Sequence, residues 1–367
     1  MPDPPPPASE PAARRLRLGE VGPSALAIAC SSGDSGVMER ACIVVGVDGS
    51  AAARQAVHWA AGLGPVLGAE VVAVHAVGLL EDLHDATEEP AAWRAHVLDR
   101  VTYTWCAGLA EAACPHRVVL RDGPPVDVLL AVARDEHADL LVVGSRGVGA
   151  AEPAQALGST SLHVLQTARC PVLVVSEPLP GEPEPAPAGL RRVLVGVDRS
   201  APSLAALDLA ADLAESAGGS LCVLEVFEYV PPFPLGPSSA RTSEAEERAI
   251  ARTRGLVEAH ARAIRDRGVG VQVIVRSGDP APTLLVVADD VDADVVVVGT
   301  RGRGDPAQPL IGSVARAVVN RIRRPTLVVP AAAGTVRLPH AGDAPGRSGG
   351  VTAGRGAAPA RGRGCGG

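Results

Sequence analysis

The chain has 367 residues, 47% of them hydrophobic, which suffices for two domains with sizeable cores and argues against global disorder. A formal net charge of -7 and an aromatic content of only 2% argue against nucleic-acid binding, because acidic surfaces repel phosphates and few rings could stack on bases. The chain contains no lysine, which excludes any phosphate site that needs a P-loop lysine.

The N-terminal segment, residues 1–40, begins with a proline run and matches no later part of the chain. We expect it to be a disordered extension. Met38 directly precedes the first apolar segment and is a candidate translation start. On that hypothesis, deletion of residues 1–37 leaves the melting temperature unchanged. The segment also lacks the pattern of a signal peptide, and no stretch of the chain is apolar enough to span a membrane, so we expect a cytoplasmic protein.

The next part of the chain, residues 41–177, alternates apolar runs with helical patterns. The runs are apolar throughout, as strands of a parallel sheet covered on both faces require. Expected strands lie near residues 43–47, 70–77, 117–120, 139–143 and 172–175, and expected helices near 51–63, 91–113, 125–137 and 159–168.

This pattern recurs in residues 191–331. A strand ending in Gly-Val-Asp, a strand ending in Gly-Ser/Thr-Arg-Gly, and a closing Pro followed by an apolar run appear in the same order in both parts. Residues 178–190 between them form a Pro-rich, semi-rigid linker, and the Gly- and Arg-rich residues 332–367 are expected to be a disordered tail.

Five strands joined by four crossover helices predict an α/β fold: two tandem doubly wound, five-stranded parallel sheets with strand order 3-2-1-4-5. The last strands, 172–175 and 326–329, would then be apolar edge strands without protecting charges. We expect them to pair with each other within the chain, while a homodimer is the other arrangement that would cover them.

Ligands of doubly wound sheets bind at the carboxyl ends of the strands, where the strand order reverses. Asp48 and Asp198 follow the first strand of each repeat, and a glycine loop follows the fourth. Each loop leads into a helix that begins with Gly-Ser, and helix N-termini favour anions such as phosphates.

The second loop, Gly299-x-x-Gly302, nine residues and Gly312-Ser313, resembles the ATP-binding signature of the universal stress protein family, whose fold is Rossmann-like. The resemblance implies that Asp198 and the backbone near Val226 hold adenine, that Gly299 lies against the ribose, and that the phosphates contact Gly302, Gly312, Ser313 and Val314. The matching residues of the first repeat are Asp48, Ala76, Gly144, Gly147, Gly158, Ser159 and Thr160.

The two loops differ in length, because ten residues separate Gly147 from Gly158 whereas nine separate Gly302 from Gly312. The second repeat fits the signature, so we expect it to be the tighter site. The first site either has a longer loop at its entrance or binds nucleotide less well.

Simpler interpretations stay open for these residues. The glycines could only shape a tight turn, and the two aspartates could only cap helices. His75, His116 and His163 lack metal-ligand spacing, and seven scattered cysteines without a CxxC pair indicate neither a zinc site nor a disulfide framework.

The sequence therefore predicts a stress-response regulator that binds ATP or AMP, with Mg²⁺ as an ion that could accompany ATP, and that has little or no catalytic turnover. We do not expect an enzyme, since no lysine, metal cluster or poised carboxylate pair is evident. The alternatives are a weak ATPase or nucleotidyl-transfer enzyme and a nucleotide-free dimerisation module.

Overall fold

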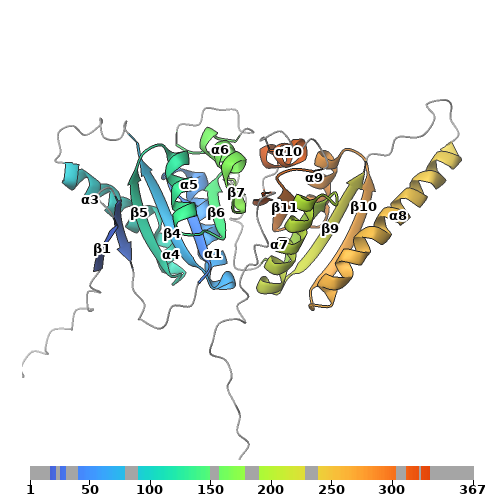
Figure 1. Ribbon diagram of the computed structural model, residues 1–367, viewed down its shortest axis with the longest axis horizontal. Helices are drawn as coiled ribbons and strands as arrows, with labels where there is room; N and C mark the ends of the chain where they lie inside the picture. Colours follow the sequence, from blue (N-terminus) through green and yellow to red (C-terminus); the bar gives the residue numbers. More distant parts are fainter. Residues whose placement is uncertain are drawn as a thin grey trace, which may run out of the picture.

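The computed structural model describes residues 17–21, 25–29, 40–78, 90–148, 157–177, 190–227, 239–302, 311–321 and 324–330. The expected linker (178–190, apart from Leu190), the expected tail (332–367) and Met38 lie outside the described residues. A 12-stranded sheet runs through the molecule in the order β1-β2-β5-β4-β3-β6-β7-β12-β11-β8-β9-β10. Figure 1 shows this sheet as two halves that meet at the centre of the molecule.

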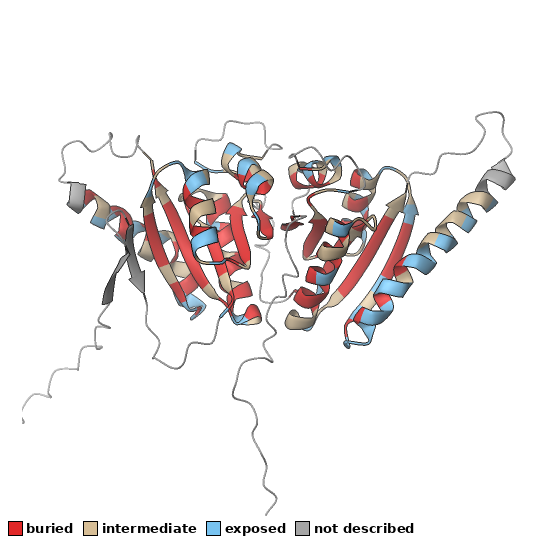
Figure 2. Ribbon diagram, in the orientation of Figure 1, coloured by how far each residue is buried: buried red, intermediate tan, exposed pale blue. Residues whose placement is uncertain are grey.

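The five strands of the first half lie in the order β5-β4-β3-β6-β7, and neighbouring strands are parallel. This is the predicted order 3-2-1-4-5. The strands are almost wholly buried, which explains why their sequences do not alternate (Figure 2). Their bounds are Cys42–Gly46 for β3, Glu70–Val77 for β4, His116–Asp122 for β5, Leu140–Gly144 for β6 and Val172–Val175 for β7.

The second half repeats this arrangement, with strands in the order β12-β11-β8-β9-β10. Its neighbouring strands are also parallel. The two-repeat α/β fold predicted from the sequence is confirmed. The strand bounds are Arg192–Val197 for β8, Ser220–Phe227 for β9, Gly270–Ser277 for β10, Val295–Gly299 for β11 and Thr326–Val329 for β12.

The first helix of each repeat has the same start and stop signals. The hydroxyls of Ser50 and Ser200 accept a hydrogen bond from the amide three residues on, and Gly68 and Gly218 end the helices in the left-handed conformation. These helices are α1, Ala51–Leu67, and α7, Ala201–Ala217. The other helices shared by the repeats are α5, Pro125–Asp135, α6, Ser159–Thr167, α9, Pro280–Asp290, and α10, Ser313–Arg321.

The helix expected over residues 91–113 is not continuous. It consists of α3, Pro90–Arg100, a π-helical turn η1, Val101–Trp105, and α4, Ala107–Glu111, whereas the second repeat has one long helix, α8, Ser239–Arg265. The amide of Cys106 donates to the carbonyl of Val101, five residues back, at 2.9 Å. The β-branched residues of η1 have low helix propensity, and π-turns inside helices are frequent at functional sites.

The N-terminal segment contains two strands, β1, Arg17–Val21, and β2, Ala25–Ala29. They pair with each other, and β2 pairs antiparallel with β5. The expectation that residues 1–40 are disordered is therefore wrong for these two stretches. The physical reason is that β5 would otherwise be an edge strand with unpaired backbone groups.

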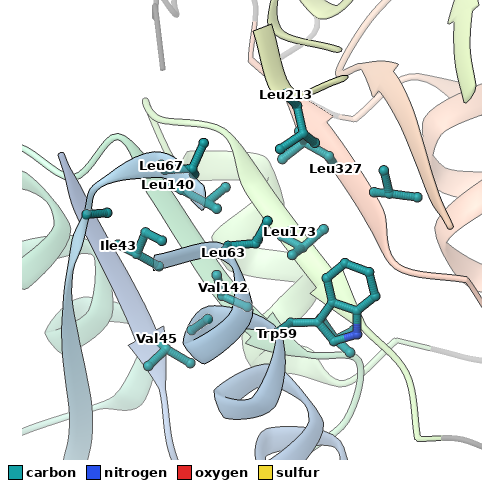
Figure 3. Packing of buried hydrophobic residues seen from close by; sticks show 14 of the residues in the cluster. Ile43, Val45, Trp59, Leu63, Leu67, Leu140, Val142, Leu173, Leu213 and Leu327 are labelled. Carbon is teal, nitrogen blue, oxygen red and sulfur yellow. The ribbon is translucent and has the colours of Figure 1, made fainter. Parts of the chain in front are cut away.

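At the centre of the sheet, β7 and β12 pair antiparallel, with Leu173 opposite Leu327. The hydrophobic cores on both faces of the sheet contain residues of both repeats. Figure 3 shows the core around this junction, where Trp59 and Leu173 of the first repeat lie near Leu213 and Leu327 of the second. Among the described residues, no helix is long and apolar enough to cross a membrane.

Candidate functional site

The second repeat has a cavity of about 410 Å³ at the carboxyl ends of β8 and β11. This is the point where the strand order reverses, as expected for a doubly wound sheet. All seven residues that the sequence predicts for this site line the cavity: Asp198, Val226, Gly299, Gly302, Gly312, Ser313 and Val314. Residues from three regions of the chain, around positions 198, 226 and 299–314, are thus brought together.

The first repeat has a larger cavity, of about 670 Å³, in the equivalent place. Its walls include all seven predicted residues of this repeat: Asp48, Ala76, Gly144, Gly147, Gly158, Ser159 and Thr160.

The two aspartates do not cap the helices; the neighbouring serines do. One carboxylate oxygen of Asp48, Oδ1, accepts from the amide of Ser50 at 2.9 Å, and the other, Oδ2, accepts from the amide of Val148 in the glycine loop at 3.1 Å. In the second repeat, the amide and hydroxyl of Ser200 donate to Oδ1 of Asp198 at 3.0 and 2.6 Å. Each aspartate is thus held rigidly at the end of the first strand and faces the cavity.

Two of the loop glycines are required by the packing of the chain itself. A Cβ atom at Gly302 would lie 2.4 Å from Oδ2 of Asp198, and one at Gly299 would lie 2.9 Å from the backbone carbon of Pro202. Gly147 and Gly144 have the same relation to Asp48 and Ala52. These glycines therefore contribute to the packing of the turn, whether or not they also contact a ligand.

The glycine that precedes each helix joins the two ends of the loop. The amide of Gly312 donates to the carbonyl of Thr300 at 2.7 Å, and the amide of Gly158 donates to the carbonyl of Ser145 at 2.9 Å. These bonds place the first turns of α10 and α6 against the cavities, and first-turn amides have no partner within a helix. One wall of each cavity thus has the backbone geometry that favours anions.

The first cavity is also lined by residues that the sequence did not predict. Gly49, His75, Arg100 and Trp105 line it. The rings of His75 and Trp105 meet edge to face at 5.2 Å between centroids, and the guanidinium of Arg100 lies 5.4 Å from the centre of the Trp105 ring. Trp105 reaches the cavity from η1, so only the unforeseen break in the helix could have revealed its role.

The other polar candidates do not form a metal site. Nδ1 of His75 lies 2.7 Å from the carbonyl oxygen of Val47, and Nδ1 of His116 lies 2.8 Å from that of Cys114, while Nδ1 of His163 lies 2.9 Å from the carbonyl oxygen of Ser159. Among the described residues, no group of three or more His, Cys, Asp or Glu side chains could hold a metal ion.

The described cysteines, Cys42, Cys106, Cys114, Cys170 and Cys222, are free thiols. Burial raises the pKa of Cys42 and Cys106 to about 12 and the pKa of the other three to about 11. A thiol reacts as its thiolate, so these side chains are poor nucleophiles at neutral pH.

The comparison with known proteins gives one consistent result. The model of the universal stress protein family matches the chain twice, over residues 41–176 and 189–330. The universal stress protein Rv2623 of Mycobacterium tuberculosis is 32% identical over 305 residues, which cover 78% of this chain and 95% of the relative. A second protein of that organism, universal stress protein Rv1996, is 32% identical over 320 residues, covering 78% of this chain and 94% of the relative.

The fold agrees with these matches. The crystal structure of a universal stress protein from Archaeoglobus fulgidus superposes with a TM-score of 0.57 at 19% sequence identity, covering 80% of this chain and 98% of that one. Both repeats match the family model, and the relatives are covered almost over their whole length. The chain therefore belongs to the universal stress protein family, as a member with two tandem repeats.

Proposed function

We propose that this protein binds an adenine nucleotide, ATP or AMP, in each repeat and acts as a stress-response regulator. The observation that carries the proposal is the second cavity, in which all seven residues predicted for a nucleotide site line one space at the switch point of the sheet. The first cavity repeats this arrangement.

Each wall of the second cavity suits one part of the ligand. The amides at the start of α10 and the hydroxyl of Ser313 would bind the phosphates, and the glycine loop lets the backbone approach them closely. The apolar side chains of Val226 and Leu284 offer a surface for the base, with the carboxylate of Asp198 as an acceptor for its amino group. Mg²⁺ could accompany ATP through its phosphates and water.

We further propose that the protein turns over little or no nucleotide. Among the described residues that line the second cavity, the one carboxylate is that of Asp198, which is already engaged by Ser200. General-base catalysis needs a group that can take a proton from water, and a carboxylate fixed in a turn is poorly suited to this. A weak ATPase or nucleotidyl-transfer enzyme is the alternative that a turnover assay would detect.

Two further points belong to this proposal. We infer that pairing of β7 with β12 holds the two repeats together within one chain, so that the sheet edges are covered without a second copy. We also infer that the protein works in the cytoplasm, where adenine nucleotides are abundant.

A titration of the full chain with ATP, AMP and cyclic AMP tests the proposal, read by calorimetry and by the shift in melting temperature. Binding to the native state raises the melting temperature by mass action, so ATP or AMP should stabilise the protein in a concentration-dependent way. Adenosine is the matched control for the phosphate contacts. If no nucleotide changes the melting temperature or releases heat, the protein is a nucleotide-free dimerisation module instead.

A further inference from the structure

The first nucleotide cavity is in contact with the second repeat. Helix α6 begins at this cavity, and Figure 1 shows α6 and α10 facing each other across the junction of the two halves. The two helices belong to different repeats, yet a hydrogen bond crosses between their segments. The amide of Leu157 donates to Oδ1 of Asn320 at 3.2 Å, although 163 positions separate the two residues in the chain.

The donor and the acceptor of this hydrogen bond belong to segments of different sites. Leu157 is the last residue of the first glycine loop before Gly158, and its side chain is half-buried against the core. Asn320 is the penultimate residue of α10, the helix whose first turn lines the second cavity. One helix therefore contacts the second site with its first turn and the loop of the first site with its last turn.

The bond anchors Leu157, the described end of the loop, beside the point where phosphates would bind. Gly158, the next residue, is held by the carbonyl of Ser145 from its own repeat. Leu157 and Gly158 are thus anchored in succession, one by the second repeat and one by the first. The residues that follow, Ser159 and Thr160 at the start of α6, line the cavity, so the anchored pair directly precedes the turn that would hold the phosphates.

In the part of the chain that the structure describes, the second site has no matching hydrogen bond from the first repeat. The residues that correspond to Leu157 and Asn320 are Ile311 and Gln166. The structure shows no hydrogen bond between these two described residues. Ile311 is instead buried, with 8% of its surface exposed. The asymmetry agrees with the loop lengths, since the first loop has the extra residue and so loses more freedom when it is ordered.

We propose that Asn320 is a positioning residue for the phosphate-binding loop of the first site, so that this site is completed by the second repeat. The inference rests on the proposed nucleotide binding. It predicts an unusual outcome: a substitution on the helix of the second site weakens the first site and leaves the second unchanged.

Calorimetry with ATP on the full chain tests this. Gly312→Val isolates the first site and Gly158→Val isolates the second. In the Gly312→Val chain, Asn320→Leu should lower ATP affinity roughly two- to tenfold, as loss of one hydrogen bond implies. In the Gly158→Val chain the same substitution should leave ATP affinity unchanged. Asn320→Ala removes the same oxygen with a smaller side chain and should behave alike if leucine disturbs folding.

Two controls separate positioning from general damage. Gln166→Leu changes the corresponding residue of α6 and should alter neither site. Adenosine lacks the phosphates that the loop would hold, so its affinity for the first site should not respond to Asn320→Leu. Equal losses at both sites, an equal loss for adenosine, or no loss at all would overturn the inference. Failure of the unaltered chain to bind ATP at either site would instead refute the proposed function itself.

Discussion

The guanidinium of Arg199 lies 3.0 Å from the carboxylate of Glu225, which is almost fully buried. The first repeat has Gly49 and His75 at the same two positions. Both of these line the first cavity, whereas neither Arg199 nor Glu225 lines the second. Exchange of one residue pair between the repeats thus accompanies the difference between cavities of 670 and 410 Å³.

Arg199→Leu should lower the free energy of unfolding by about 1–3 kcal/mol, because the buried carboxylate of Glu225 loses its charged partner. Arg199 also has a φ of 65°, a left-handed conformation that costs a side chain about 1 kcal/mol. The double variant Arg199→Gly/Glu225→His, which installs the pair of the first repeat, should therefore recover most of the loss. Urea unfolding measures the free energy of unfolding of both variants. A double variant no more stable than Arg199→Leu would show that the residue pairs of the two repeats are not interchangeable.

The second site should bind ATP more tightly than the first. A Cβ at Gly312 would lie 3.1 Å from the carbonyl oxygen of Thr300, tighter than an ordinary contact, so valine there would crowd the proposed phosphate-binding wall while its neighbours shift by only a few tenths of an ångström. Gly312→Val should abolish the higher-affinity phase in calorimetry and lower the ATP stoichiometry, and Gly158→Val should remove only a weaker phase. The reverse pattern would assign the tighter site to the first repeat.

Lysine in either central strand should disrupt the junction between the repeats. Val174 and Val328 are 3% and 0% exposed, so Val174→Lys or Val328→Lys would bury an unpaired charge at the β7–β12 pair. We expect a loss of about 3 kcal/mol or more and a larger sedimentation-derived radius. Val286→Lys, at a position 59% exposed, is the matched control and should change neither quantity. Junction variants that match this control would mean that the edges are covered in another way.

The five described thiols should resist alkylation at neutral pH. Since burial raises their pKa to about 11 or 12, iodoacetamide should label them slowly at pH 8 and faster with each unit of rising pH. A Cys30→Ser/Cys365→Ser chain removes the two thiols outside the described residues, and mass spectrometry counts the labels. Rapid labelling of this chain at pH 8 would contradict the burial.

The raised pKa values of the thiols also predict how the free energy of unfolding changes with pH. A thiol whose pKa is higher in the folded state than in the unfolded state contributes stability that is fully present below the unfolded value, about 8.5. This contribution decreases as the pH rises from there through the folded values of about 11 and 12. Unfolding free energy measured between pH 8 and 10.5 should therefore decrease, and Cys106→Ala should reduce the slope.

The sequence predicted the strands and their order well, and the residues that it named in each repeat line one cavity, because apolar runs and repeated glycine loops depend on local sequence. The break at Val101–Trp105 was missed, since a π-turn costs only a few dihedral adjustments and leaves the helical pattern intact. The pairing of β2 with β5 was missed because a short strand in a polar, Pro-rich segment depends on the edge that it covers. The contact between Leu157 and Asn320 joins distant residues and has no signal in either loop.

The β7–β12 junction also determines how this molecule can change. In a symmetric dimer of identical chains, one substitution alters both sides of the interface and both sites at once, so every change must suit two environments. When the two sides of the interface are encoded by separate repeats of one chain, a mutation changes only one side. Asn320 on one helix and Gln166 at the corresponding position of the other, together with loops of different length, are a combination that a gene encoding a single repeat could not specify.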